Sequence, residues 1–247
     1  NGQLQAYGHA EDDELTLTCT TGDKRVAAIV NAPLVSNVTD ETSLKALTSS
    51  FSENAISRFV MSGMDAKKIE STGTVTVPVV LTGVKNNFEL EQHKGLDFKI
   101  KSAFLVSAPK DRKFFSVSSP TGWINKGVSD MSQIISSSGT LMYQALNSDK
   151  VAHGSTYEAD CSLYCYPNPL TSGMTPTYLV VEATLGNALY YYPVDLPSME
   201  ANKCYNVSLT VCRPGSSSPD VPVEKRDVLF DVQVKPWDGN VTVNEII

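Results

Sequence analysis

Strict alternation of apolar and polar residues is the feature that most limits how this chain can fold. In YNVSLTV, residues 205–211, apolar side chains occupy every second position and polar ones fall between them. The stretch VLFDVQVKP, residues 228–236, repeats the pattern. A period of two places alternate side chains on opposite faces of a β-strand. Each run therefore predicts a strand with one buried and one solvated face.

Similar runs recur along the whole chain and predict a mainly β protein. Two of them, 177–185 and 188–196, are more uniformly apolar and predict central strands buried on both faces. The other predicted strands are 14–20, 25–31, 59–63, 74–80, 96–107 and 162–166.

One short helix is expected in TDETSLKALTSSF, residues 39–51. Leu44, Leu47 and Phe51 recur at helical spacing there, and Thr39 or Asp40 can cap the first turn. A single helix among so many strands predicts β-sandwiches.

Length and loop composition predict two domains. A chain of 247 residues suits one large domain or two ordinary ones. A loop-like stretch, 107–123, follows a long strand, and a polar, Ser- and Gly-rich stretch continues to about residue 138. We therefore expect an N-terminal domain of residues 1–110 and a C-terminal domain of residues 111–247.

Charge and hydropathy exclude several classes of protein. The net charge is −7 and the pI about 5.0, which argues against binding nucleic acid or an anionic membrane surface. No apolar run approaches the ~20 residues that span a bilayer. The polar, acidic opening has no signal-peptide character, and export remains compatible with the sequence.

The five cysteines cannot all pair within the chain. Cys161 and Cys165, and likewise Cys204 and Cys212, share strand-like runs, where straight strands hold them too far apart for a disulfide. Most are expected to be buried thiols, with a cross-strand bridge or a zinc site as the alternatives.

No motif for catalysis or cofactor binding is present. Three scattered histidines lack metal-ligand spacing, and phosphate-binding and nucleophile-elbow motifs are absent. The acidic run 11–14 is expected to be a solvated loop, with a calcium site as its alternative. Trp123 and Trp237 could stack on sugars, although core packing is the commoner use of such aromatics. We expect no enzyme activity, cofactor or metal.

Several segments together resemble the fimbrillins, the subunits of Bacteroidetes (type V) pili, and in particular a FimA-like fimbrial subunit. They are CTTGDKRVAAIVNAP, FVMSG, SLYCYPNP, YLVVEATL, YYYPVDL, NKCYNVSLTVCRPGSSSPDVPVEK and VQVKPW, in the order of that family. Each segment alone is weak evidence of the resemblance, but the ordered set is specific and covers nearly the whole chain. The sequence departs from the family in two places: it lacks an apolar strand before NGQLQ, and 76–90 lacks the basic residues often found in the corresponding strands of the family.

The resemblance implies two transthyretin-like β-sandwich domains in tandem, with the short helix in the first. It also implies a precursor exported as a lipoprotein to the outer membrane, where a maturation protease removes the first strand. The vacated groove of the N-terminal domain would then accept the C-terminal strand of the next subunit. Partners would be other fimbrial subunits at the cell surface and a host or bacterial surface ligand.

The end of the chain is suited to strand donation. Residues 241–247 alternate, but burying their few apolar side chains barely offsets the entropy of ordering seven residues. A donor segment of 228–247 has more apolar surface to bury in a partner. Its predicted donor residues are Val232, Val234, Trp237, Val241, Val243 and Ile246. The alternatives to a fimbrial structural subunit are a tip or accessory adhesin that binds a glycan or protein and, less favoured, an exported glycan-active enzyme.

Overall fold

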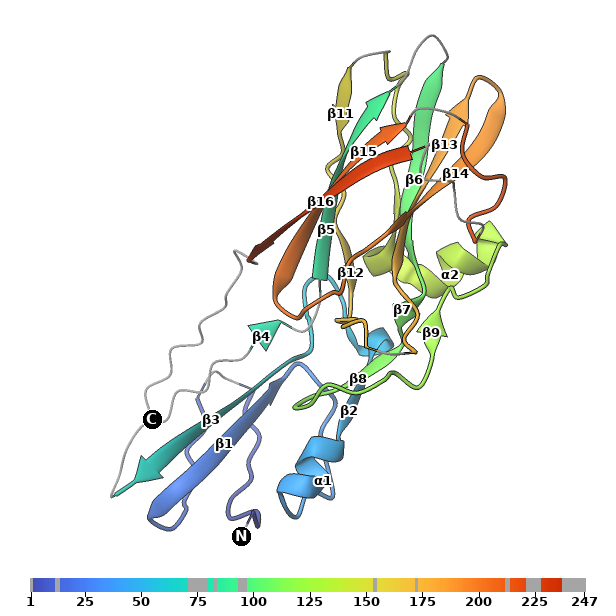
Figure 1. Cartoon of the computed structure of the whole chain (residues 1–247). Coiled ribbons are helices and arrows are strands. Elements are labelled where there is room, and N and C mark those ends of the chain that lie inside the picture. The colour runs from blue at the N-terminus through green and yellow to red at the C-terminus, as the bar shows by residue number, and fades with distance from the viewer. Residues whose placement is uncertain are drawn as a thin grey trace. The chain divides into compact units, whose positions relative to one another are not determined.

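The computed structural model describes most of the chain (Figure 1). The described residues are 2–11, 14–70, 80–81, 84–92, 97–152, 155–171, 173–211, 214–220 and 228–236. Within 80–92 and 228–236 the description is of the backbone, together with the side chains of Val232 and Val234.

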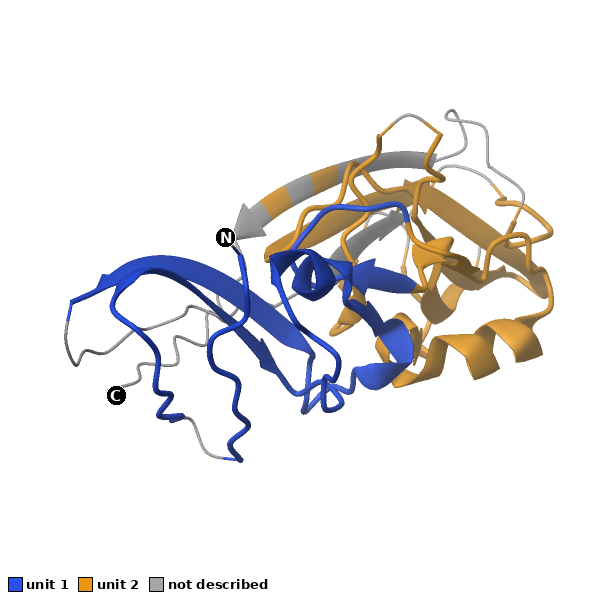
Figure 2. Ribbon diagram, turned by 90° about the horizontal axis from the view of Figure 1, so that it is seen from below, with its two compact units in different colours: residues 1–82, 111–119, 238–247 blue, residues 83–110, 120–237 orange. Residues whose placement is uncertain are grey.

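The chain divides into two compact units, which Figure 2 shows in different colours. Among the described residues, unit 1 contains those up to 81 and 111–119, and unit 2 contains 84–110 and 120–236. The chain thus enters unit 2, returns to unit 1 for nine residues and enters unit 2 again. The domain boundary expected near residue 110 stays a prediction. The compact units group 84–110 with 120–236.

Unit 1 is built on two small antiparallel sheets. The larger has the strand order β1-β3-β4, and its ladder pairs Gly22 with Ile69 at one end and Val30 with Met61 at the other. The elements of unit 1 are β1 (Gly22–Val30), α1 (Glu41–Ala46), β2 (Thr48–Ser50), the 3-10 helix η1 (Phe51–Glu53), β3 (Met61–Ile69), β4 (Val80–Leu81) and β8 (Asp111–Lys113), the last paired with β2.

Helix α1 is shorter than the helix predicted over 39–51. Asp40 caps it as expected: its carboxylate accepts from the Ser43 backbone N–H at 2.8 Å, and the Ser43 hydroxyl accepts from the Asp40 N–H. The helix ends at Ala46 because Leu47 takes an extended conformation. Residues Thr48–Ser50 form β2 instead, so pairing with β8 prevails over the helical spacing of the apolar residues.

Unit 2 is a sandwich of two sheets (Figure 1). The four-stranded sheet has the order β10-β6-β13-β14 and is antiparallel throughout. The five-stranded sheet has the order β11-β5-β15-β16, with β12 also paired to β5, and its β5–β15 ladder is parallel. The strands are β5 (Val84–Gln92), β6 (Phe98–Val106), β10 (Tyr143–Ala145), β11 (Thr156–Glu158), β12 (Leu163–Cys165), β13 (Tyr178–Leu185), β14 (Ala188–Asp195), β15 (Lys203–Val211) and β16 (Val228–Pro236), with a small ladder of β7 (Ala108–Pro109) and β9 (Trp123–Ile124) beside them.

The core of unit 2 follows the alternation in the sequence. In β15 the side chains of Tyr205, Val207, Leu209 and Val211 are buried, and those between them are half-buried. The two-residue period therefore marks the inner face, as predicted. The mainly β prediction and the sandwich prediction are both confirmed.

A second helix, α2 (Met131–Met142), lies in the polar stretch that was expected to be a loop. Asp130 caps it by accepting from the Ser132 backbone N–H at 2.8 Å. Ile134 is fully buried in a cluster with Phe104 and Val180 of the adjacent sheet. The prediction of a single helix was wrong because burial of this one apolar stripe outweighs the low helix propensity of a serine-rich sequence.

Two strand predictions also require correction. Residues 14–20 alternate, yet they form no strand, and most of their side chains are exposed. The stretch 188–196 was expected to be a central strand, but β14 lies at the edge of its sheet. The predicted strands at 25–31, 59–63, 96–107, 162–166 and 177–185 each contribute to an observed strand, whereas 74–79 lies outside the described residues.

Candidate assembly surfaces

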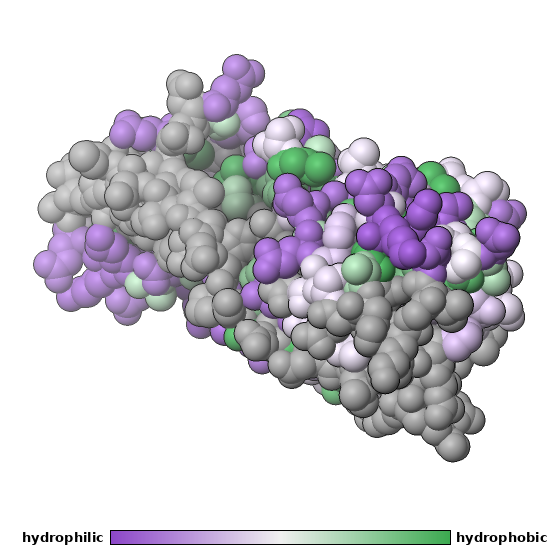
Figure 3. All heavy atoms as spheres, turned by 90° about the horizontal axis from the view of Figure 1, so that it is seen from above, coloured by the Kyte–Doolittle hydropathy of each residue, from purple (hydrophilic) through white to green (hydrophobic). Residues whose placement is uncertain are grey.

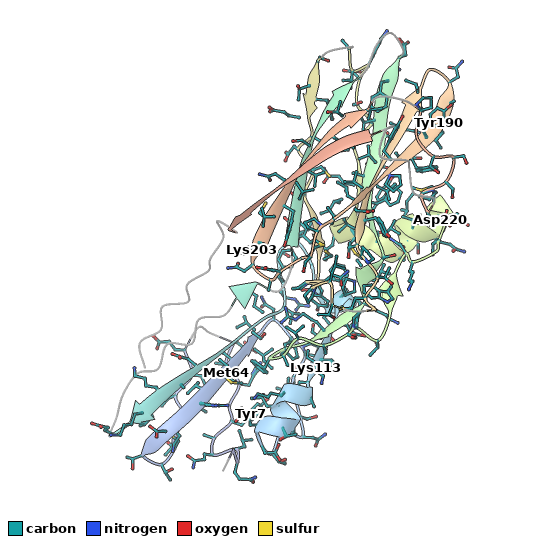
Figure 4. All side chains as sticks on the ribbon, viewed as in Figure 1. Tyr7, Met64, Lys113, Tyr190, Lys203 and Asp220 are labelled. Carbon is teal, nitrogen blue, oxygen red and sulfur yellow. The ribbon has the colours of Figure 1, made fainter. Side chains whose placement is uncertain are left out.

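Strand β16, which contains two predicted donor residues, is paired along its whole length with a strand of its own chain. All nine of its residues face β15 in an antiparallel ladder from Lys203–Pro236 to Val211–Val228. Val232 lies opposite Val207, and Val234 lies opposite Tyr205. Figure 4 labels Lys203 at the start of β15, where this ladder begins. The first half of the predicted donor segment is thus an integral strand of unit 2.

The outer side of β16 is an open edge among the described strands. β16 ends the strand order of its sheet, and β15 occupies its one described neighbouring position. Val232 is half-buried, and Val234 is 49% exposed although it pairs with the buried Tyr205. The other predicted donor residues, Trp237, Val241, Val243 and Ile246, lie outside the described residues.

The β14 edge of the other sheet, unlike the β16 edge, is partly covered by another segment of the chain. Tyr191 and Ser216 exchange two backbone hydrogen bonds of 2.9 and 2.8 Å, so the segment 214–220 covers part of this edge. A Cβ on Gly215 would lie 2.4 Å from the Tyr191 carbonyl oxygen, so only glycine allows this close approach. Pro193 removes a further donor from the strand. Figure 4 labels Tyr190 on β14 and Asp220 at the end of the covering segment.

The described part of unit 1 buries far fewer hydrophobic side chains than that of unit 2. Among the described residues, its buried hydrophobic side chains are Phe51, Val60 and Phe114, and all the others belong to unit 2. No residue of β1 is buried. Among the described side chains of unit 1, the large hydrophobic ones that are exposed are Leu4, Tyr7, Leu17, Leu34, Ile56 and Val117.

Among the residues whose side chains are described, unit 2 exposes fewer large hydrophobic side chains than unit 1. They are Ile135, Leu170, Leu189 and Val234. Figure 3 shows apolar side chains scattered among polar ones on one face of the molecule. Isolated apolar side chains of this kind are ordinary on protein surfaces.

The residues considered for chemistry do not converge on a reactive centre. No group of three potential metal ligands occurs in the part of the chain that the structure describes. His9 is exposed, as are Glu11 and Glu14, while His93 and His153 lie outside that part. Trp123 is half-buried, with the Lys126 ammonium 5.8 Å from its ring centroid. No helix of the described chain is long and apolar enough to cross a membrane.

The cysteines in unit 2 are packing residues. Cys161 and Cys165 are fully buried, and burial raises the pKa of each thiol to about 12. Cys204 is half-buried, and Cys19 in unit 1 is exposed. The expectation of buried thiols is thus met by Cys161 and Cys165, whereas Cys19 is exposed and Cys204 is only half-buried. Cys212 lies outside the described residues.

One buried polar pair was not predicted from the sequence. The Glu182 carboxylate, on β13, accepts from the Ser102 hydroxyl of β6 at 2.6 Å, and both side chains are buried. The pKa of nearby Tyr191 is raised by burial and by the charge of Glu182. Glu182 stands out in the sequence as the one charged residue of an apolar run, which is the signal that could have marked it.

These observations define a mainly β protein in which unit 2 is a sandwich of two sheets and the described part of unit 1 buries few apolar side chains. Its neighbours among solved structures are fimbrilins and candidate cell adhesion proteins of Bacteroidales. The fimbrilin FimA from Porphyromonas gingivalis aligns with a TM-score of 0.63 and 17% identity, covering 99% of this chain and 90% of that one.

Two further structures share the fold. A candidate cell adhesion protein from Bacteroides eggerthii aligns with a TM-score of 0.70 and 19% identity, covering 96% of this chain and 85% of that one. The tip fimbrial protein Mfa3 from Porphyromonas gingivalis, in a form with a C-terminal truncation, aligns with a TM-score of 0.52 and 11% identity, covering 90% and 83%. No family model and no curated protein sequence matches the chain.

Proposed function

We propose that this chain is a structural subunit of a cell-surface fimbria and that it polymerises by exchanging a β-strand between subunits. The observation that carries the proposal is the small core of unit 1. Its principal strand, β1, has no buried residue, although its sequence contains the apolar run Val26–Val30. These apolar side chains are half-buried, and such a sheet gains stability when a further strand packs against it. The shared fold with fimbrilins supports this role.

The paired state of β16 limits which residues can be donated. Moving β16 to another subunit would break a nine-residue ladder and uncover the buried Val207 and Leu209. We therefore propose that donation begins after Pro236, with Trp237, Val241, Val243 and Ile246 as the donated apolar residues. Val232 and Val234 then belong to the anchored strand from which the donor segment extends.

The proposed life cycle follows from the family resemblance. The precursor would be exported with a lipid anchor to the outer membrane, and a maturation protease would free the acceptor groove of unit 1. The mature subunits would then assemble at the cell surface into a fimbria that supports adhesion to a host or bacterial ligand. The role is structural, and no catalytic step is part of it.

Filament formation tests the proposal directly. The chain would be treated with trypsin at limiting concentration and examined by negative-stain electron microscopy and size-exclusion chromatography. Replacing Val241, Val243 and Ile246 by alanine should abolish filaments and leave the monomer folded. The matched control replaces Thr242, Asn244 and Glu245 by alanine and should still polymerise. Filaments from the first variant, or an unfolded monomer, would overturn the assignment of these residues as donors.

A further inference from the structure

A small polar cavity opens on unit 1. It has a volume of about 160 Å³ and is lined by Asn31, Ala32, Pro33, Glu53 and Arg58. A water molecule occupies about 30 Å³ of liquid volume, so the cavity has room for roughly five waters. That is well below the ~300 Å³ at which pockets for whole drug-sized ligands begin. It therefore suits one ring or one residue of a larger ligand.

The walls of the cavity are held in place by hydrogen bonds among their own groups. Asn31 has a left-handed backbone (φ 61°). Its side-chain amide donates to the Phe59 carbonyl at 3.0 Å, a hydrogen bond that links the wall at 31–33 to the segment after Arg58. Ala55 and Arg58 exchange backbone hydrogen bonds of 3.1 and 2.9 Å and close a tight turn. The Asn54 side chain also accepts from the Val60 N–H at 3.0 Å. Because the polar groups of these loops already have hydrogen-bond partners, the cavity needs little reorganisation to bind a ligand.

The two charged side chains of the cavity are not paired with each other. Glu53 is half-buried, and one of its carboxylate oxygens accepts from the buried Ser49 hydroxyl at 3.0 Å. Arg58 is exposed. Neither residue takes part in the salt bridges found among the described residues. The cavity thus presents a strong hydrogen-bond acceptor and a strong multiple donor.

This combination selects the charge type of the ligand. Glu53 and Arg58 carry opposite charges, so the cavity has no net preference for an anion or a cation, and a neutral group with adjacent donors and acceptors can bond to both side chains. Sugar hydroxyls have this character. From the geometry we infer that the cavity binds a single neutral sugar residue at the end of a glycan. This inference is independent of the proposed strand exchange.

Binding to the monomer tests the inference without any need for filaments. The V241A/V243A/I246A variant, which is expected to remain monomeric, would be titrated with methyl α-D-mannoside, methyl β-D-galactoside and N-acetyl-D-glucosamine by saturation-transfer NMR. At least one sugar should bind in the millimolar range, because one small ring offers few contacts. Glu53→Gln and Arg58→Gln should each weaken that binding roughly five- to tenfold, because a charge-assisted hydrogen bond becomes a neutral one.

Matched variants and other ligands make the test decisive. Glu14→Gln and Arg25→Gln make the same changes at exposed sites outside the cavity and should leave sugar binding unchanged. Circular dichroism would show that each variant is folded. The inference would be overturned if no sugar bound, if Glu53→Gln and Arg58→Gln bound like the starting protein, or if only inorganic phosphate or free alanine bound.

Discussion

Val232 of β16 lies directly opposite Val207 of β15, at the middle of a nine-residue antiparallel ladder. Val207 is 1% exposed, so β16 helps to cover the interior of unit 2. The near-terminal strand is therefore part of a folded sheet as well as the base from which a donor segment would extend.

Two truncations should separate these roles. A chain that ends at Pro236 keeps the β15–β16 ladder and should unfold in urea with nearly unchanged stability. A chain that ends at Asp227 loses all nine pairs and should lose cooperative unfolding of unit 2, because Val207 and Leu209 would be uncovered. Circular dichroism during urea titration measures both. Equal stability of the two chains would show that β16 is dispensable for the fold.

Gly139, the single glycine of α2, should be sensitive to substitution. It has φ 53° and ψ −159° inside the helix, a conformation that residues with a side chain rarely adopt. Gly139→Ala should lower the free energy of unfolding by about 1–3 kcal/mol. Because no atom lies within 4 Å of the added Cβ, the cost would come from the backbone.

Gly122→Ala is the matched control for Gly139. Its backbone is not left-handed, and its added Cβ would meet the Lys110 side chain at an ordinary 3.6 Å. The Tm of Gly122→Ala should therefore equal that of the starting protein. Thermal unfolding of both variants gives the comparison, and an unchanged Tm for Gly139→Ala would contradict the prediction.

Ser102→Ala should destabilise unit 2 by leaving the Glu182 carboxylate without its donor. An unsatisfied buried polar group costs about 1–3 kcal/mol, and more when it is charged. Ser208→Ala, at a half-buried position of β15, should change stability much less. In the double variant Ser102→Ala with Glu182→Gln, the two losses should not add, because the residues share one interaction. Additive losses in urea unfolding would show that the hydrogen bond contributes little.

Stability should fall at alkaline pH. Burial raises the pKa of the Cys161 and Cys165 thiols from 9.0 to about 12, and that of Tyr192 from 10.0 to about 12. Above pH 9 the unfolded chain loses these protons while the folded chain keeps them, so the unfolded state is favoured progressively up to pH 12. Urea unfolding across this range should show the decline. Cys161→Ala with Cys165→Ala should flatten it between pH 9 and 10, and an unchanged slope there would exclude the thiols as its cause.

Thiol labelling should separate the cysteines by burial. Cys19 is exposed and should react with a disulfide reagent within the folded chain. Cys161 and Cys165 should react only after unfolding, because they are buried and remain protonated at neutral pH. Mass spectrometry of labelled peptides identifies each site. Rapid labelling of Cys165 in native protein would show that unit 2 opens readily.

Local patterns predicted most of the strands, because alternation is a property of neighbouring residues. The run 205–211 became β15 with its apolar face inward, and Asp40 capped α1 as its chemistry required. Alternation also misled at 14–20, where no strand forms. A two-residue period is a necessary feature of a half-buried strand, but a strand also needs a partner with free backbone groups.

By itself the sequence determined that the chain is mainly β, that its cysteines are not arranged for disulfides within strands, and that its end alternates. Only the tertiary structure decided that β16 pairs with β15, that β14 lies at an edge, and that α2 covers Phe104 and Val180. It also brought Asn31 and Pro33 to the same cavity as Glu53 and Arg58. Periodicity fixes which face of a segment is apolar, whereas the partner of that face depends on packing between segments that are distant in the chain.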